Sequence, residues 1–380
     1  MDLHVAIVAR GLPTLRYPLH GIFEWDQAKA LSKAGIQVDF FAVDLRSFRR
    51  LRPWGITHGH KDGITWHCFS IPIGRSPLLF RIKVGVWALQ KLYENVFRQI
   101  AAPDIIHAHF DEFGFMAAHL SKRVHVPFVV TEHRSDILDL NPPSNFLYML
   151  RESHSNAARV IAVSSRLKEC IQRSTGVEAE IIPNIVSHCF SVRRISHQGF
   201  VFVSTGALEI GKRHRLVIEA FASILAYYDA IKLEIIGDGN LRKELQALVA
   251  DLNISNKVTF HGTLAREQIA EIYRQCDCFV LPSAYETFGV VYIEAMAAGL
   301  PVIATRCGGT EDFVTEVNGI LVDVDDVEGL KDAMMKMCEM REAFDGERIS
   351  ADTLSRFSPR SIANQLENIY TQVLWESTIG

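Results

Sequence analysis

Short runs of β-branched and apolar residues alternate with helix-type patterns along almost the whole chain, and this alternation restricts the fold more than any other feature. In the first part of the chain the runs lie at 4–9, 38–43, 104–109, 128–133, 160–164 and 179–183. A helical pattern fills residues 22–34, and Gly35 ends it. Apolar strands separated by helices are typical of a parallel sheet that is covered by helices on both faces. The pattern therefore predicts the α/β class.

The same alternation starts again near Phe200. The second series of expected strands lies at 200–205, 233–237, 258–262, 278–283, 301–305 and 319–322. Residues 185–199 have no clear periodicity, and we place the linker between two domains there. The length of 380 residues suits two domains of ordinary size. Ligands of open α/β sheets bind beyond the carboxyl ends of the strands, so we expect a ligand cleft between the two domains.

Composition excludes several classes of protein. Hydrophobic residues make up 48% and charged residues 22%, as in a water-soluble globular protein, and the net charge of −4 argues against general nucleic-acid binding. The seven cysteines include no CxxC pair, which favours reduced thiols in a cytoplasmic protein. The amino terminus lacks the basic start and long apolar run of a signal peptide, and no uncharged apolar run reaches the ~20 residues that span a bilayer.

A basic stretch interrupts this acidic background. Between Leu45 and Tyr93 the single acid is Asp62, whereas the same stretch holds nine lysines and arginines. Such a stretch indicates either an anionic partner or a solvated face whose acids come from elsewhere in the fold. The sequence leaves both interpretations open.

A strand, a loop and a short helix follow one another between residues 278 and 301. Residues 290–298 are good helix formers, Gly299 suits a left-handed cap, and Pro301 prevents continuation. The free N–H groups and positive dipole end of such a helix suit a phosphate or sugar hydroxyls, and Gly289 allows a ligand to approach the backbone closely.

Two glutamates flank this expected helix start. Glu286 lies on the loop, and Glu294 lies about one turn inside the helix among apolar neighbours. The arrangement suits a nucleotide sugar, with Glu286 on the hexose, backbone N–H groups near the phosphates and Glu294 on the ribose diol. A helix-terminal acid and a purely structural carboxylate would give the same spacing, so spacing alone does not decide.

The segment PSAYETFGVVYIEAMAAGLPVIATRCGG (282–309) closely resembles the signature of retaining GT-B glycosyltransferases of the glycosyltransferase family 4 type. The likeness continues in order through most of the chain, at 20–38, 181–186, 204–214, 233–245, 258–264 and 367–374. It implies two Rossmann-like domains facing each other across a cleft. Residues 1–186 would bind the acceptor, 187–355 would bind the nucleotide sugar, and a helix in 356–380 would cross back to the first domain.

The resemblance assigns catalytic roles to His133, Lys212 and Glu286. Lys212 would neutralise the diphosphate as the leaving group gains charge. The family's arginine position is Ala207 here, and Arg213 is the candidate replacement. His133 would face the donor sugar without acting as a general base. A surface lysine and a buried structural histidine are the simpler alternatives.

The donor-binding set follows from the same resemblance. It comprises Gly21, Gly206, Lys212, Arg213, Leu264, Glu286, Thr287, Phe288, Gly289, Val290 and Glu294. Gly21 is alternatively an ordinary turn glycine, and Leu264 would contact the base through its backbone. Asn184 is interpreted as a turn residue. The D-x-D within residues 323–326 is interpreted as a loop with N-capping acids, so we expect no metal and no cofactor; a UDP-sugar is the preferred donor.

An amphipathic pattern with a spacing of three and four residues marks the acceptor side. It consists of Leu79, Ile82, Val86, Leu89, Tyr93, Val96 and Ile100. Core packing is the favoured interpretation. The basic and aromatic segment 46–55 suits anionic headgroups or a lipid-linked pyrophosphate, which gives the hypothesis of peripheral attachment to the inner face of the plasma membrane.

Three functions compete at this stage. The first is a retaining transferase that moves a hexose to a hydroxyl of a sugar or lipid-linked acceptor, in cell-surface polysaccharide or glycolipid synthesis. The second is a non-catalytic partner subunit that binds sugar nucleotides, which Ala207 favours. The third is a sugar-nucleotide epimerase on the same fold. The ordered motifs favour the first.

Overall fold

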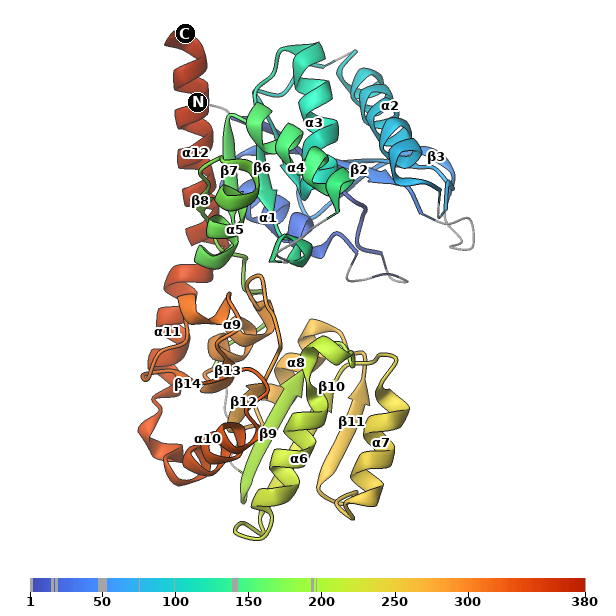
Figure 1. Ribbon diagram of the computed structural model, residues 1–380. Coiled ribbons are helices and arrows are strands. Elements are labelled where there is room, and N and C mark those ends of the chain that lie inside the picture. The colour runs from blue at the N-terminus through green and yellow to red at the C-terminus, as the bar shows by residue number, and fades with distance from the viewer. Residues whose placement is uncertain are drawn as a thin grey trace. The chain divides into compact units, whose positions relative to one another are not determined.

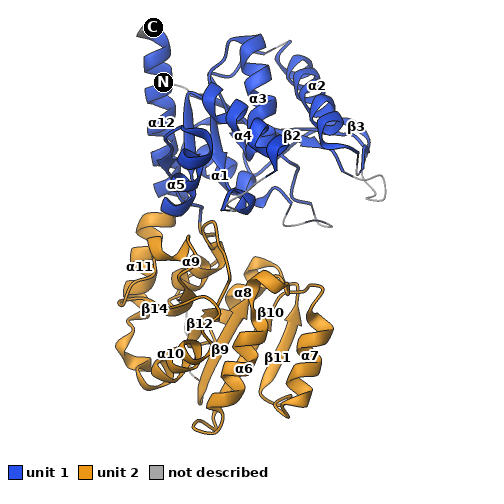
Figure 2. Ribbon diagram, viewed as in Figure 1, with its two compact units in different colours: residues 1–185, 359–380 blue, residues 186–358 orange. Residues whose placement is uncertain are grey.

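The computed structural model describes residues 3–14, 17, 20–46, 53–74, 76–98, 100–138, 143–192, 195 and 197–379. The chain divides into two compact units, one of residues 1–185 with 359–380 and one of residues 186–358 (Figure 2). Each unit is a largely parallel sheet with helices against it (Figure 1), so the predicted α/β class is confirmed.

Eight strands of the described residues form the sheet of the first unit, in the order β3-β4-β2-β1-β5-β6-β7-β8. They are β1 (His4–Ala9), β2 (Gln37–Asp44), β3 (Gly55–Lys61), β4 (Ile64–Ser70), β5 (Ile105–His109), β6 (Phe128–Glu132), β7 (Arg159–Ala162) and β8 (Glu180–Ile181). Every neighbouring pair is parallel except β3 with β4. The strand order reverses direction between β1 and β5, and the carboxyl ends of strands at such a reversal are the usual ligand position.

The hairpin of β3 and β4 was missed by the sequence analysis. Its turn is Asp62-Gly63, and both residues have positive φ, 55° and 79°. Such two-residue turns match the twist of paired strands, and Asp-Gly is one of their strongest signals. The unusual content of histidine and lysine in these strands hid the alternation of side chains.

Seven helical segments belong to the first unit: α1 (Ile22–Lys33), α2 (Leu78–Phe97), α3 (Asp111–Val124), η1 (Ser135–Leu138), α4 (Ser144–Asn156), α5 (Ser165–Thr175) and α12 (Pro359–Ile379). The last of these returns from the end of the chain and packs against α1, which confirms the predicted crossing (Figure 1). Its inner face buries Ile362, Leu366, Ile369 and Tyr370 in the core of this unit. Spacings of three and four residues place these side chains on one helix face.

The six-stranded sheet of the second unit has the order β11-β10-β9-β12-β13-β14 and is parallel throughout. Its strands are β9 (Phe200–Thr205), β10 (Ile231–Ile236), β11 (Val258–Gly262), β12 (Cys278–Leu281), β13 (Val302–Thr305) and β14 (Gly319–Val322). The helical segments are η2 (Ile210–Lys212), α6 (His214–Ile224), α7 (Arg242–Asp251), α8 (Arg266–Tyr273), α9 (Val290–Ala297), η3 (Thr310–Asp312), α10 (Val327–Glu339), η4 (Arg341–Ala343) and α11 (Gly346–Phe357). The reversal of strand order lies between β9 and β12, so the loops after these two strands are the expected ligand position.

The basic stretch is only partly described, because residues 47–52 and 75 lie outside the described residues. Where it is described, three of its cations have acidic neighbours: Arg46 pairs with Asp44, Arg81 with Glu112 and Lys91 with Glu94. Along α2, Ile82, Leu89 and Tyr93 are buried as core packing requires, whereas Leu79 is exposed; Ile100, which lies beyond the end of α2, is also exposed. All seven cysteines are free thiols. The search of the described helices found none that is long and apolar enough to cross a bilayer.

Candidate active site

The turn between β12 and α9 has the geometry that its sequence predicts. Gly289 precedes the helix with φ 93°, in the left-handed region, and a Cβ there would lie 2.7 Å from the ring of Tyr292. Glycine is therefore needed for both conformation and space. Gly299 has φ 83° just after the helix, and Leu300 N donates to Ala295 O, which closes the helix end as expected.

Glu286 lies on this turn and is 8% exposed. Its Oε1 accepts hydrogen bonds from Lys212 Nζ at 2.6 Å and from Ser283 Oγ at 2.8 Å. Among the described residues, its Oε2 accepts no hydrogen bond. The carboxylate is thus held in place through one oxygen, and its other oxygen has no protein donor among the described residues.

Lys212 reaches Glu286 from η2, in the loop after β9. Its neighbour Arg213 has φ 55° and points its guanidinium to Asp325, with Nε 2.6 Å from Oδ1. Arg213 therefore has a partner in this structure, whereas no such contact ties Lys212 away from Glu286. Asp326 accepts from Gly329 N and caps α10, which confirms the capping interpretation of the D-x-D segment.

Glu294 lies inside α9 and is 4% exposed. Its Oε1 forms an ion pair with Arg266 Nε at 3.1 Å. A buried carboxylate requires donors, and the first residue of α8 supplies a cation in addition to the ligand diol that the sequence analysis considered. Arg266 was not predicted from the sequence, although it begins the helix two residues after Leu264.

The other expected donor-binding residues surround the same two loops. Gly206 follows β9, and a Cβ there would lie 3.5 Å from the ring of His214. Burial, together with the charge of Lys212, lowers the pKa of His214 to about 4, so its ring is neutral at physiological pH. Phe288 is 2% exposed and packs against Phe313, so only its backbone can face a ligand. Leu264, Thr287 and Val290 are half-buried.

In the first unit, His133 follows β6 and stacks between two aromatic rings. The His109 ring lies 5.3 Å away at an interplanar angle of 13°, and Phe23 lies 6.0 Å away at 17°. His133 Nε2 shares a hydrogen bond of 3.0 Å with His109 Nδ1. Burial first, and then the charge of Arg10, lower the pKa of His133 to about 3. A ring that stays neutral suits the expectation that His133 contacts the sugar without acting as a base.

Asn184 is 5% exposed, and its side chain partly opposes the fall in the pKa of His133. Gly21 has φ 74° at the start of α1, and a Cβ there would lie 2.1 Å from Gly11 O. Gly21 is thus fixed by a close backbone approach, which is more than an ordinary turn requires.

The second unit thus brings an ion-paired lysine and two buried glutamates to the start of one helix, beside a parallel six-stranded sheet. Comparisons with known proteins identify the family. The sequence profile of the Glycosyltransferase Family 4 matches residues 24–188, and that of Glycosyl transferases group 1 matches residues 190–348.

Individual relatives agree with these profiles. The chain is 28% identical over 297 residues to N-acetyl-alpha-D-glucosaminyl L-malate synthase of Bacillus anthracis, covering 73% of this chain and 77% of the relative. The structure matches sucrose-phosphate synthase from Thermosynechococcus elongatus with a TM-score of 0.82 and 21% identity, over 98% of this chain and all of the other. Anabaena Alr3699/HepE in complex with UDP matches with a TM-score of 0.72 and 21% identity, over 97% of this chain and all of the other.

The chain therefore belongs to glycosyltransferase family 4 and has the GT-B fold. It is a glycosyltransferase that takes its sugar from a nucleotide sugar, in a family of retaining hexosyltransferases.

Proposed function

We propose that this enzyme transfers a hexose from a UDP-sugar, with retention of the anomeric configuration, to a hydroxyl of a sugar or lipid-linked acceptor in cell-surface polysaccharide or glycolipid synthesis. The observation that carries the donor site is the Lys212–Glu286 pair of 2.6 Å at the reversal point of the second sheet. The UDP and UDP-glucose complexes of Anabaena HepE support the choice of UDP.

The geometry of the second unit supports the following donor contacts. The backbone of Gly206 and the N–H groups at the start of α9 receive the diphosphate, and Lys212 turns from Glu286 to the phosphate oxygens as charge develops there. The free Oε2 of Glu286 accepts from a sugar hydroxyl. Glu294, which pairs with Arg266, accepts from the two ribose hydroxyls. Arg213 contributes to the diphosphate only if it leaves Asp325.

In the first unit, His133 presents a neutral ring to the transferred sugar. The neighbouring rings of His109 and Phe23, which are nearly parallel to it, help to hold its plane. No carboxylate is assigned as a nucleophile, so a double displacement of the glycosidase kind is not part of this proposal.

The same unit offers a membrane-facing surface. On α2, Leu79, Phe80 and Trp87 are 63%, 54% and 50% exposed, and Lys83 and Lys91 lie on the exposed side of the same helix. Apolar and aromatic side chains beside lysines suit the interface of an anionic bilayer. Flotation with anionic vesicles tests this contact: Trp87→Ser should reduce the bound fraction, and equal flotation of both proteins at low salt would exclude α2 as the contact.

The hydrolysis of UDP-[1-13C]glucose in the absence of acceptor tests the reaction itself. We expect slow release of glucose whose first detected anomer by NMR is α, because retention preserves the configuration of the donor. Glu286→Gln and Lys212→Ala should abolish release. First release of the β anomer, or a C2-inverted sugar nucleotide as product, would overturn the proposed reaction.

A further inference from the structure

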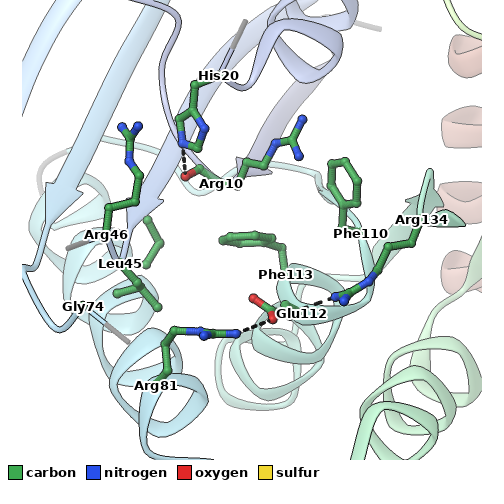
Figure 3. Close-up of a pocket in the computed structure, with 11 residues that line it drawn as sticks. Arg10, His20, Leu45, Arg46, Gly74, Arg81, Phe110, Glu112, Phe113 and Arg134 are labelled. Atoms are coloured by element: carbon green, nitrogen blue, oxygen red, sulfur yellow. Dashed lines mark hydrogen bonds and ion pairs between the residues drawn. The ribbon is translucent and has the colours of Figure 1, made fainter. Parts of the chain in front are cut away.

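A pocket of about 470 Å³ is lined by residues of the first unit. Four arginines and one glutamate supply its charged lining: Arg10, Arg46, Arg81, Arg134 and Glu112. In Figure 3, Phe113 lies near the middle of the lining, with Arg46 and Arg81 on one side of it and Phe110 and Arg134 on the other. The four guanidinium groups and one carboxylate are thus part of a wall that is otherwise largely apolar, as in ordinary ligand pockets.

The position of the pocket follows from the topology of the sheet. Arg10 comes directly after β1, Arg46 lies two residues after β2, and Phe110 comes directly after β5. These three strands meet at the point where the strand order of the first sheet reverses. The pocket therefore occupies the place where open α/β sheets bind ligands.

Arg134 uses its donors on protein acids, but the other three arginines keep some for a ligand. Arg134 donates to Asp111 through Nη1 and to Asp136 through Nε and Nη2. Arg46 donates to Asp44 through Nε and Nη2, and its Nη1 is buried without a partner among the described residues.

Arg81 contacts Glu112 through Nη2 at 2.8 Å, which leaves its Nε and Nη1 without a partner in the described part of the chain. Arg10 Nε lies 3.3 Å from Glu24, which is fully buried. Burial raises the pKa of Glu24 although Arg10 opposes the shift, so this acid is a weak counter-charge for Arg10.

One wall of the pocket reaches His133. The Arg10 guanidinium lies 4.5 Å from the centroid of the Phe110 ring, and the Phe110 ring lies 5.0 Å from the His133 ring. A ligand in this pocket would therefore end next to the histidine that we assign to the transferred sugar. That is the position required of an acceptor.

We propose that this pocket binds a phosphate group of the acceptor, with Arg10, Arg46 and Arg81 as its donors. That the phosphate belongs to the acceptor rests on the proposed function, whereas phosphate binding by the pocket does not. Guanidinium groups from three separate elements line the pocket, and guanidinium is a side-chain group well suited to the several acceptor oxygens of a phosphate. Phe110 and Phe113 cover the apolar part of the acceptor beside its phosphate.

Calorimetric titration of the full chain with pyrophosphate, glucose 6-phosphate, farnesyl diphosphate and malate tests the proposal. The Lys212→Ala background removes the diphosphate contact of the donor site. In that background we expect pyrophosphate to bind, and Arg81→Gln and Arg46→Gln each to weaken it about tenfold or more. Arg123→Gln is the matched control, because this exposed arginine of the same unit pairs with Glu94. The variant should bind pyrophosphate with the same affinity as the background protein.

The comparison of glucose 6-phosphate with farnesyl diphosphate identifies the kind of acceptor that carries the phosphate. Tighter binding of glucose 6-phosphate than of farnesyl diphosphate supports a soluble phosphosugar, and the opposite order supports a lipid-linked pyrophosphate. Equal pyrophosphate affinity in all variants, absence of binding by every phosphate probe, or tighter binding of malate would each overturn the pocket assignment. If Lys212→Ala loses UDP binding and no phosphate probe binds to the first unit, the pocket inference is wrong, but the donor-site assignment still holds.

Discussion

Substitution of Lys212 and substitution of Glu286 should lower the free energy of unfolding by different amounts. Lys212→Ala leaves the Glu286 carboxylate, whose side chain is 10% exposed, with the Ser283 hydroxyl as its remaining donor. A hydrogen bond to a charged group contributes about 1.5–3 kcal/mol, so the free energy of unfolding should fall by about that amount. Glu286→Gln keeps an oxygen for Ser283 and releases Lys212, which is 29% exposed, to water. We expect that change to cost less than about 1 kcal/mol.

Thermal unfolding converts these energies into a measurable difference. For a unit of this size 1 kcal/mol corresponds to about 2–4 °C, so Lys212→Ala should lower the Tm by about 3–12 °C and Glu286→Gln by at most about 4 °C. UDP and UDP-glucose should both raise the Tm of the parent protein. Lys212→Ala should lose most of both increases, because the cation contacts the diphosphate. Glu286→Gln should keep the increase with UDP and lose the additional increase with UDP-glucose.

The matched control is Lys243→Ala, which removes an exposed lysine of α7 in the same unit. It should change neither the Tm nor the response to ligand. A loss of stability in Glu286→Gln equal to that in Lys212→Ala would refute the energetic reasoning about the pair. A full UDP response in Lys212→Ala would show that Lys212 does not contact the diphosphate.

Three further predictions concern single features of the fold. Gly289→Ala should destabilise the protein by about 1–2 kcal/mol from the left-handed φ alone, measured by urea unfolding, and should weaken UDP binding because the Cβ meets Tyr292 at 2.7 Å; unchanged stability would contradict the strain. Tyr370→Phe removes the 2.6 Å hydrogen bond to His107 Nδ1 and should cost about 1–3 kcal/mol, whereas Tyr227→Phe at an exposed site should cost nothing measurable. His133 should stay neutral down to about pH 4, because its folded pKa of about 3 lies below the unfolded value; its contribution to stability is lost as the pH falls from about 6.5 towards 3, and an NMR titration midpoint near 6.5 would exclude the buried environment.

Much of the architecture was predictable because buried parallel strands are short apolar runs that stand out in a sequence. The expected strands at 4–9, 200–205, 258–262 and 319–322 have the observed bounds. The hairpin of β3 and β4 was not predicted, since its side chains alternate with histidine and lysine, but its Asp62-Gly63 turn carried a usable signal.

The site was only partly predictable for a physical reason. Gly289 and Glu286 lie close together in the sequence, so local pattern and resemblance find them together. Arg266 and His109 act through contacts with residues 28 and 24 positions away, Glu294 and His133, and a sequence without aligned homologues does not pair such positions. The four arginines of the pocket come from four separate segments of the chain, which meet only in the folded structure.

Isothermal titration of UDP into the parent protein and into Glu294→Gln tests the central claim most directly, because Glu294 is assigned to the ribose and lies away from the reacting bond. The account predicts that UDP binds the parent protein and that the substitution weakens binding about tenfold or more, through the loss of charge-assisted hydrogen bonds to the ribose diol. Equal affinity of the two proteins for UDP would contradict the assignment of the nucleotide to the start of α9.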